Sequence, residues 1–405
     1  MNKISQLNDR SPFQWLILCF PFGIAIQSLA SLLAYFKLRH LRQEYVNEVG
    51  KMFKIPLFVG ALSVLWIFIS SLLNPLTDNW ESFQDLIGYV NWILLPFLAL
   101  LAFPLLTPSS MNKIITTIKW ACLIWGVIVI SQKVIGWRIA GHILVADGSR
   151  PRGLYSHPLT LAYCSLIPWP LIFASLLKNP KDLLNWLAAF SLGLTLYVTL
   201  SRTVQATAFL VVVWSIMAHF RGPAKKKGLL LILFIFSSFF LLSNPAADKI
   251  LETFEPEGTD RISGYQDDRI AFWYAHWAMI KERPLTGHGS GLDGKYREPY
   301  YRKIGLEAFS KKYEAHNTFL QMAANGGLIS LTLFLFWLLW NIKSVISLPD
   351  GLEKQVCLQS LMVFFLSGLT QNSFQDSEFR YGLTLMIAVI WQLIFFHRKK
   401  LGDPI

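Results

Sequence analysis

Long apolar runs separated by short polar segments dominate the chain and predict membrane-spanning helices. The runs recur at lengths of about 20 residues, which is what a helix needs to cross the hydrocarbon core of a bilayer. Strands of a membrane barrel would alternate in polarity, whereas these runs are continuous. We therefore predict an all-α, polytopic transmembrane helix bundle. The expected spans are residues 13–36, 55–73, 87–106, 114–136, 159–177, 183–200, 203–219, 228–243, 316–341, 356–374 and 378–397.

The number of spans depends on the first run. Pro21 and Gly23 lie near its middle, so residues 13–36 form either one span or a hairpin of two short helices. The total is eleven in the first case and twelve in the second. This run lacks a small-residue cleavage site and leads into a basic segment, so we expect no cleavable signal peptide.

One polar interruption is far longer than the others. Residues 244–315 separate a transmembrane bundle over residues 1–243 from the C-terminal spans over residues 316–405. Inside this loop, residues 267–281 have the sequence DDRIAFWYAHWAMIK and predict an amphipathic helix with Asp267 as its cap. Its apolar stripe consists of Ile270, Trp273, Trp277 and Ile280. Such a helix lies on the membrane surface or packs on the ends of spans.

The polar flanks of this helix carry Arg269 and His276, and we interpret His276 as a surface histidine. Pro284 and Gly287 end the helix. The following GHGSGLDG segment (287–294) predicts a flexible turn, because it neither follows a strand nor ends in Lys-Ser or Lys-Thr as a phosphate-binding loop does.

The short basic loops set the orientation in the membrane. The segments at 37–54, 221–227 and 397–400 are basic and are expected in the cytoplasm, whereas the acidic segment 74–86 is expected outside. Counting spans back from the C-terminal tail then places both 137–158 and 244–315 outside. The two long polar loops share one face.

The composition agrees with a membrane protein: 53% of residues are hydrophobic, 15% are charged, and the mean hydropathy is +0.42. The net charge of +12 lies mainly outside residues 244–315, which hold 11 Lys and Arg against 12 Asp and Glu. We attribute the excess to cytoplasmic loops and anionic membrane lipids, and expect no nucleic-acid partner. The four cysteines lie in apolar spans without CxxC spacing and suggest neither disulfides nor zinc. The acids Asp267, Asp268 and Asp293 lack the spacing of a cation loop.

Arginines on the outer face are the candidate binding groups. Arg138, Arg150 and Arg152 lie in the loop 137–158, where short external loops normally avoid positive charge. They either contact lipid phosphates or serve a ligand. Arg202, in TLSRTVQA, either reaches the headgroups or faces a cavity. We favour the cavity, because a second arginine loop is expected on the same side.

The order of elements R…W…PLTGHG…HNTFLQMAANGGL, over residues 269–328, resembles the signature region of a known family. This family is the O-antigen ligase and O-antigen polymerase superfamily of bacterial membrane glycosyltransferases. The resemblance covers about 150 residues, from SRTVQA through the span after His316. The chain departs from the pattern at Asn325, where family members often have an acidic residue.

The resemblance implies an inverting transfer of an oligosaccharide from an undecaprenyl-pyrophosphate carrier to an acceptor hydroxyl, without a cofactor, metal or nucleotide sugar. It places the protein in the bacterial inner membrane with its large loop in the periplasm. His316 resembles the general base. Arg202 and Arg269 resemble the pyrophosphate-binding positions, as does one of Arg150 and Arg152. Asn317 is a candidate for orienting the imidazole or the substrate.

The residues suit this chemistry on their own terms. Arginine forks match phosphate oxygens and stabilise a leaving group as its charge develops, and a histidine can accept a hydroxyl proton near neutral pH. The acceptor would be the lipid A core in a ligase, which we favour, or a second glycan in a polymerase. A transporter of a small solute or lipid is the alternative of another class. It would carry ionisable residues at mid-membrane and related halves, and we detect neither.

Overall fold

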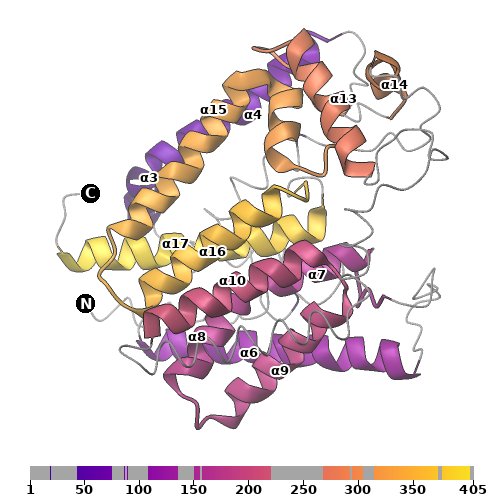
Figure 1. Ribbon diagram of the computed structural model, residues 1–405. Coiled ribbons are helices and arrows are strands. Elements are labelled where there is room, and N and C mark those ends of the chain that lie inside the picture. The colour runs from indigo at the N-terminus through magenta and orange to yellow at the C-terminus, as the bar shows by residue number, and fades with distance from the viewer. Residues whose placement is uncertain are drawn as a thin grey trace.

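Helices form all the regular secondary structure of the described residues, and the predicted all-α polytopic bundle is confirmed. The computed structural model describes residues 43–74, 108–135, 150–155, 157–219, 268–291, 294–303, 314–372 and 376–401, with Cys19, Leu86 and Tyr89. Its helices are α3 (Gln43–Met52), α4 (Lys54–Leu72), α6 (Pro108–Ile130), α7 (Pro158–Leu166), α8 (Trp169–Lys178), α9 (Leu183–Val198), α10 (Arg202–His219), α13 (Asp268–Glu282), α14 (Gly294–Lys303), α15 (Thr318–Ile346), α16 (Leu352–Gly368) and α17 (Ser377–Leu401) (Figure 1).

Most predicted spans coincide with described helices. Four of these helices are long and apolar enough to cross a membrane, namely α4, α6 with the π-helical turn that follows it, α15 and α17. Helices α9, α10 and α16 also stand at predicted positions. The spans predicted at 13–36, 87–106 and 228–243 lie outside the described residues, apart from Cys19 and Tyr89, so the choice between eleven and twelve spans stays open.

The span predicted at 159–177 is not one straight helix. It consists of α7 and α8, which meet at an angle of 41°. The break falls at Ile167 and Pro168, and a second proline, Pro170, stands in the first turn of α8. Proline has no N–H to donate and clashes with the preceding turn, so this sequence cannot continue a straight helix.

Helix α15 is also broken, at Gly326 and Gly327. Gly326 has φ −121° and ψ 15°, and Gly327 has φ 66° and ψ −170°, so the short first part of α15 folds back beside α13 (Figure 1). Residues 284–289, which follow α13, supply hydrogen-bond partners for the backbone at the break. Leu328 N donates to Pro284 O (2.7 Å), and the amides of His288 and Gly289 donate to the carbonyls of Ala324 (2.9 Å) and Asn325 (2.7 Å). These bonds satisfy backbone groups that the break removes from the helix.

The end of α4 closes the same junction from the other side. Trp66 Nε1 donates to Gly326 O (2.9 Å), Ser290 N donates to Ser71 Oγ (3.0 Å), and Asn74 Nδ2 donates to His288 O (2.7 Å). Residues 287–290 are buried as a result. The prediction of a flexible turn was therefore wrong for this part of the segment, because its glycines serve close backbone packing.

Several polar side chains within the spans bond to neighbouring helices. Ser191 Oγ on α9 donates to Cys122 O on α6 (2.8 Å), beside Gly126. Trp391 Nε1 on α17 donates to Asn341 Oδ1 on α15 (2.7 Å) and stacks on Phe53 at 4.7 Å. Small residues and buried hydrogen bonds of this kind hold helices together in lipid, where the hydrophobic effect between helices is weak.

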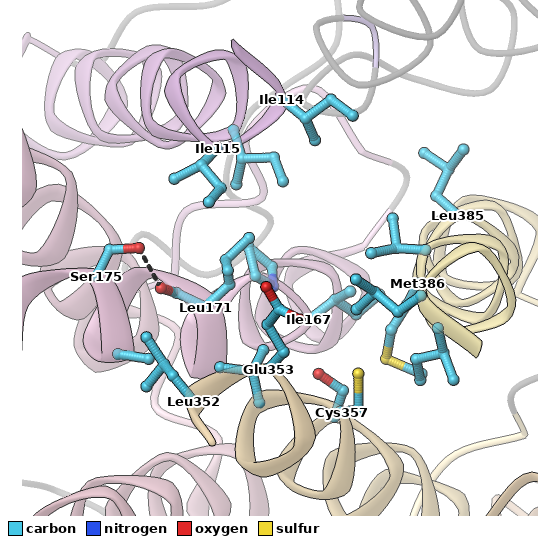
Figure 2. A pocket seen from close by; sticks show the side chains of 18 of the residues that line it. Ile114, Ile115, Ile167, Leu171, Ser175, Leu352, Glu353, Cys357, Leu385 and Met386 are labelled. Atoms are coloured by element: carbon cyan, nitrogen blue, oxygen red, sulfur yellow. Dashed lines mark hydrogen bonds between the residues drawn. The ribbon is translucent and has the colours of Figure 1, made fainter. Parts of the chain in front are cut away.

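A large cavity lies between α6, α8, α16 and α17, with a volume of about 720 Å³ (Figure 2). Ile115, Ile167, Leu171 and Met386 are among the side chains that line it. The cavity is open at one side, where Lys178, Asp350 and Glu353 lie, so a molecule from outside the bundle can enter it.

The junction at the break of α15 should be intolerant of side chains. A Cβ at Gly327 would lie 2.1 Å from Leu285 O, and the positive φ strains any L residue there. We expect Gly327→Ala to lower the melting temperature of the purified protein by several degrees, as a loss of about 1–3 kcal/mol predicts. Gly50→Ala in α3 is the control, because no atom lies within 4 Å of its Cβ position. Equal melting temperatures for the two variants would contradict the tight fit.

Candidate functional site

Arg202 stands at the start of α10, directly after a tight turn. Leu200 adopts φ 51° in this turn, and Gln205 Nε2 donates to Tyr197 O (3.1 Å) across it. Arg150 Nε donates to Thr199 O (2.8 Å), so its guanidinium lies against the negative end of α9. Arg150 and Arg202 thus both lie at the turn between α9 and α10. The hydrogen bond from Arg150 to Thr199 O helps to fix this turn. Arg202 itself is half-buried.

Tyr163 joins this turn to three other elements. It lies on α7 and is fully buried, and its hydroxyl is 2.8 Å from Thr370 Oγ1, just after α16. Ser201 and Thr203, on either side of Arg202, lie close to the same hydroxyl, and the positive charge of Arg269 acts on it. Tyr163 therefore connects the surroundings of Arg202 with Arg269.

His316 lies against the helix that carries Arg269. The ring of His316 is 5.5 Å from the ring of Phe272, which stands three residues after Arg269 on α13. Both Arg269 and His316 are half-buried. The hydroxyl of Tyr163 thus lies near the two neighbours of Arg202 and within range of the charge of Arg269, while His316 lies against α13. Tyr163 and Asn317 both bond to the segment that follows α16, so these elements meet at that end of the helix.

The backbone at His316 is held in an unusual conformation. His316 has φ 44°, a left-handed value that costs a non-glycine residue about 1–3 kcal/mol and persists only where its surroundings fix it. Asn317 caps α15 by accepting from Phe319 N (2.9 Å) and Leu320 N (3.0 Å), and it donates to Leu369 O (3.1 Å). Asn317 thus fixes the start of α15 beside His316.

Side chains also hold the residue before His316. Trp273 Nε1 donates to Ala315 O (3.0 Å), and Ala315 N donates to Gln321 Oε1 (3.1 Å). Gln321 Nε2 in turn donates to Asn325 Oδ1 (2.8 Å), and Asn325 Nδ2 donates to Tyr89 Oη (3.0 Å). Asn325, where the family often has an acid, therefore continues a buried chain of hydrogen bonds that ends at the backbone next to His316.

His276 is not a surface residue, and the interpretation from sequence was wrong. Its side chain is fully buried, Nδ1 donates to Phe272 O (2.7 Å), and Nε2 has no hydrogen-bond partner among the described residues. Burial, and secondarily the charge of Arg297, lowers the pKa of His276 to about 3. The helix packs through Ala271 and Ala275 on α15, because small residues permit close approach, while Trp277 of the predicted stripe stays half-exposed.

Two further features complete the region. Asp376 caps α17 at Phe379 N (3.0 Å) and accepts from Thr160 Oγ1 on α7 (2.6 Å). Glu314, two residues before His316, accepts from Asn372 Nδ2 (3.0 Å). Arg152 is half-buried. Within the described ranges, no group of three His, Cys, Asp or Glu residues could hold a metal ion. The cavity of Figure 2 contains none of the predicted site residues.

Sequence reasoning missed Tyr163, Trp273, Gln321 and Asp376. Only Asp376 had a local signal, since it precedes Ser-Glu-Phe at the start of a predicted span and so resembles a helix cap. The other three act through contacts with residues distant in the sequence. Periodicity within one segment cannot identify such contacts.

Residues 187–335 match the family model described as O-antigen ligase. This segment belongs to the O-antigen ligase and polymerase superfamily. The match runs from α9 through the break of α15, so it includes Arg202, Arg269 and His316 together with the junction at Gly326 and Gly327. No curated protein matches the chain.

The buried His276 should make stability depend on pH. The folded state keeps it neutral down to about pH 3, whereas the unfolded chain takes up a proton below about pH 6.5. Stability is therefore complete above pH 6.5 and falls as the pH drops, by up to about 1.4 kcal/mol per pH unit.

We expect His276→Asn to reduce the loss of melting temperature between pH 7 and pH 5 in detergent. His219→Asn, at the exposed end of α10, is the control and should leave the loss unchanged. An equal loss of melting temperature in the unsubstituted protein, His276→Asn and His219→Asn would show that His276 does not govern the pH dependence.

Proposed function

We propose that the protein transfers an oligosaccharide from undecaprenyl pyrophosphate to an acceptor hydroxyl at the outer face of the inner membrane, most simply the lipid A core. The match of residues 187–335 supports an activity of the O-antigen ligase or polymerase kind. The conformation of His316 is the observation that carries the finer assignment. A strained histidine, fixed from both sides and set beside the helix of Arg269, is typical of a functional site.

In the proposed reaction, His316 removes the proton from the acceptor hydroxyl as its oxygen attacks the anomeric carbon. The bond from that carbon to the pyrophosphate oxygen breaks in the same displacement, which inverts the configuration. Arg202 and Arg269 bind the pyrophosphate and stabilise the charge that develops on it. Arg150 or Arg152 supplies further positive charge. Fixed guanidinium groups act without a metal ion in this scheme.

The fixed backbone next to His316 fits this role. A general base must stay within hydrogen-bond reach of the proton that it removes. Trp273 and Gln321 hold Ala315, and Asn317 holds the start of α15, so rotation of the backbone at His316 is restricted from both sides. We infer that this restriction aims the imidazole at the acceptor.

A repeat-unit polymerase uses the same donor and the same groups, and differs only in the acceptor. One assay compares the alternatives. The purified protein is placed in proteoliposomes with an undecaprenyl-pyrophosphate glycan and either lipid A core or a second carrier-linked unit. Product on the lipid A core supports a ligase, and a longer carrier-linked glycan supports a polymerase. Movement of the glycan without a new bond would favour a transporter.

In this assay His316→Ala should lower the rate of transfer by about 10²–10⁴, the usual contribution of a general base. His219→Ala is the matched control, because His219 is exposed at the far end of α10. Membrane levels of both variants are measured in parallel. Normal transfer by His316→Ala would refute the assignment of the base.

Arg202→Lys and Arg269→Lys should each lower kcat/KM at least about tenfold, because an ammonium cannot reproduce a bidentate contact with phosphate. Arg302→Lys is the control, since Arg302 is exposed on α14 and pairs with Glu298 one turn earlier (3.1 Å). Full activity of both test variants would mean that these arginines are structural.

A further inference from the structure

We propose that the cavity of Figure 2 is a binding site for one phospholipid whose headgroup carries both a phosphate and an ammonium group. The site is separate from the candidate site around His316, and only the argument against the tail of the glycan donor as occupant rests on the proposed function. Three observations support it: the apolar chamber, the charges at its mouth, and its place in the bundle.

The inner part of the cavity suits an acyl chain. Its volume of about 720 Å³ lies within the ~300–1,000 Å³ of typical ligand sites. Ile115, Ile167, Leu171 and Met386 point into the space from three helices, and Ser175 is already bonded to Leu171 O (2.8 Å) (Figure 2). Most of the lining is apolar, so an acyl chain fits the inner part of the cavity.

The mouth of the cavity carries charges of both signs. Lys178 ends α8, while Asp350 and Glu353 lie at the start of α16. Asp350 is paired with Lys354 (2.9 Å), but Lys178 and Glu353 form no ion pair with another described residue. A phosphate next to Lys178 and an ammonium next to Glu353 would neutralise both groups. An anionic headgroup without an ammonium would leave the carboxylate of Glu353 uncompensated.

The position of the mouth argues against the tail of the glycan donor as the occupant. Helix α16 begins with Leu352 at the mouth and ends near Thr370 beside the candidate site. Its 17 residues, rising about 1.5 Å each, separate the two ends by about 25 Å. A pyrophosphate held by Arg202 and Arg269 would therefore enter the bundle at the opposite end. The mouth instead faces the other leaflet, where ordinary phospholipids are available.

The test is native mass spectrometry of the full chain, extracted from bilayers of equal parts phosphatidylethanolamine and phosphatidylglycerol. One phosphatidylethanolamine should remain bound after most lipid is removed. Met386→Trp and Leu171→Trp should abolish this retention by filling the cavity, whereas Leu187→Trp, half-exposed on α9, should retain the lipid. A melting curve for each variant shows that it is folded.

The charges at the mouth are tested separately, because exposed substitutions there leave the packing intact. Lys178→Gln and Glu353→Gln should each lower the preference for phosphatidylethanolamine over phosphatidylglycerol by up to about fivefold, as for one surface ion pair. A bilayer that also contains undecaprenyl phosphate tests the competing occupant. Retention of no lipid, of phosphatidylglycerol, or of the polyprenyl lipid would overturn the proposal, as would equal retention in the Met386→Trp and Leu187→Trp variants.

Discussion

The break in α15 is the constraint on which the arrangement of the other elements depends. A helix interrupted inside a membrane protein must find new partners for its freed backbone groups. Here the segment 284–289 supplies them, and Trp66 of α4 takes the carbonyl of Gly326. Because the first part of α15 folds back, α13 packs on it and the residue at its start, His316, lies beside Phe272. A straight α15 would carry His316 away from α13.

Much of the bundle could be predicted from hydropathy, because continuous apolar runs are required by lipid and leave a clear trace in the sequence. The breaks could not be placed in the same way. Pro168 and Pro170 stand within an apolar run, and only the geometry shows that α7 and α8 bend there. Gly326 and Gly327 resemble any small-residue pair in a span. Their role depends on the distant backbone of residues 284–289, with which no local pattern could connect them.

The same division applies to the candidate site. Arg202, Arg269 and His316 could be named from the sequence because Arg202 stands in a very short turn between two apolar runs, and because the motif order of all three resembles a family. The side chains that fix these three residues in place could not be identified from the sequence. Trp273 and Gln321 bind backbone atoms, and Tyr163 meets α10 and α16 through its hydroxyl. The sequence predicted His276 on the wrong face, because it gave weight to large apolar residues while the helix packs through alanines.

The pairing of polar groups bears on the choice between transfer and transport. A transporter keeps ionisable groups near mid-membrane, where they bind and release the cargo. In the described spans, several buried polar side chains are neutral and bonded to neighbouring helices, as with Asn341 and Trp391 or Gln359 and Ser215. Lys119 is buried but pairs with Asp182 at the start of α9 (3.2 Å). The half-buried arginines and histidine gather at one end instead. Half-buried arginines at the end of the bundle suit a lipid-linked pyrophosphate, whose charge stays at headgroup depth while its tail remains in the membrane.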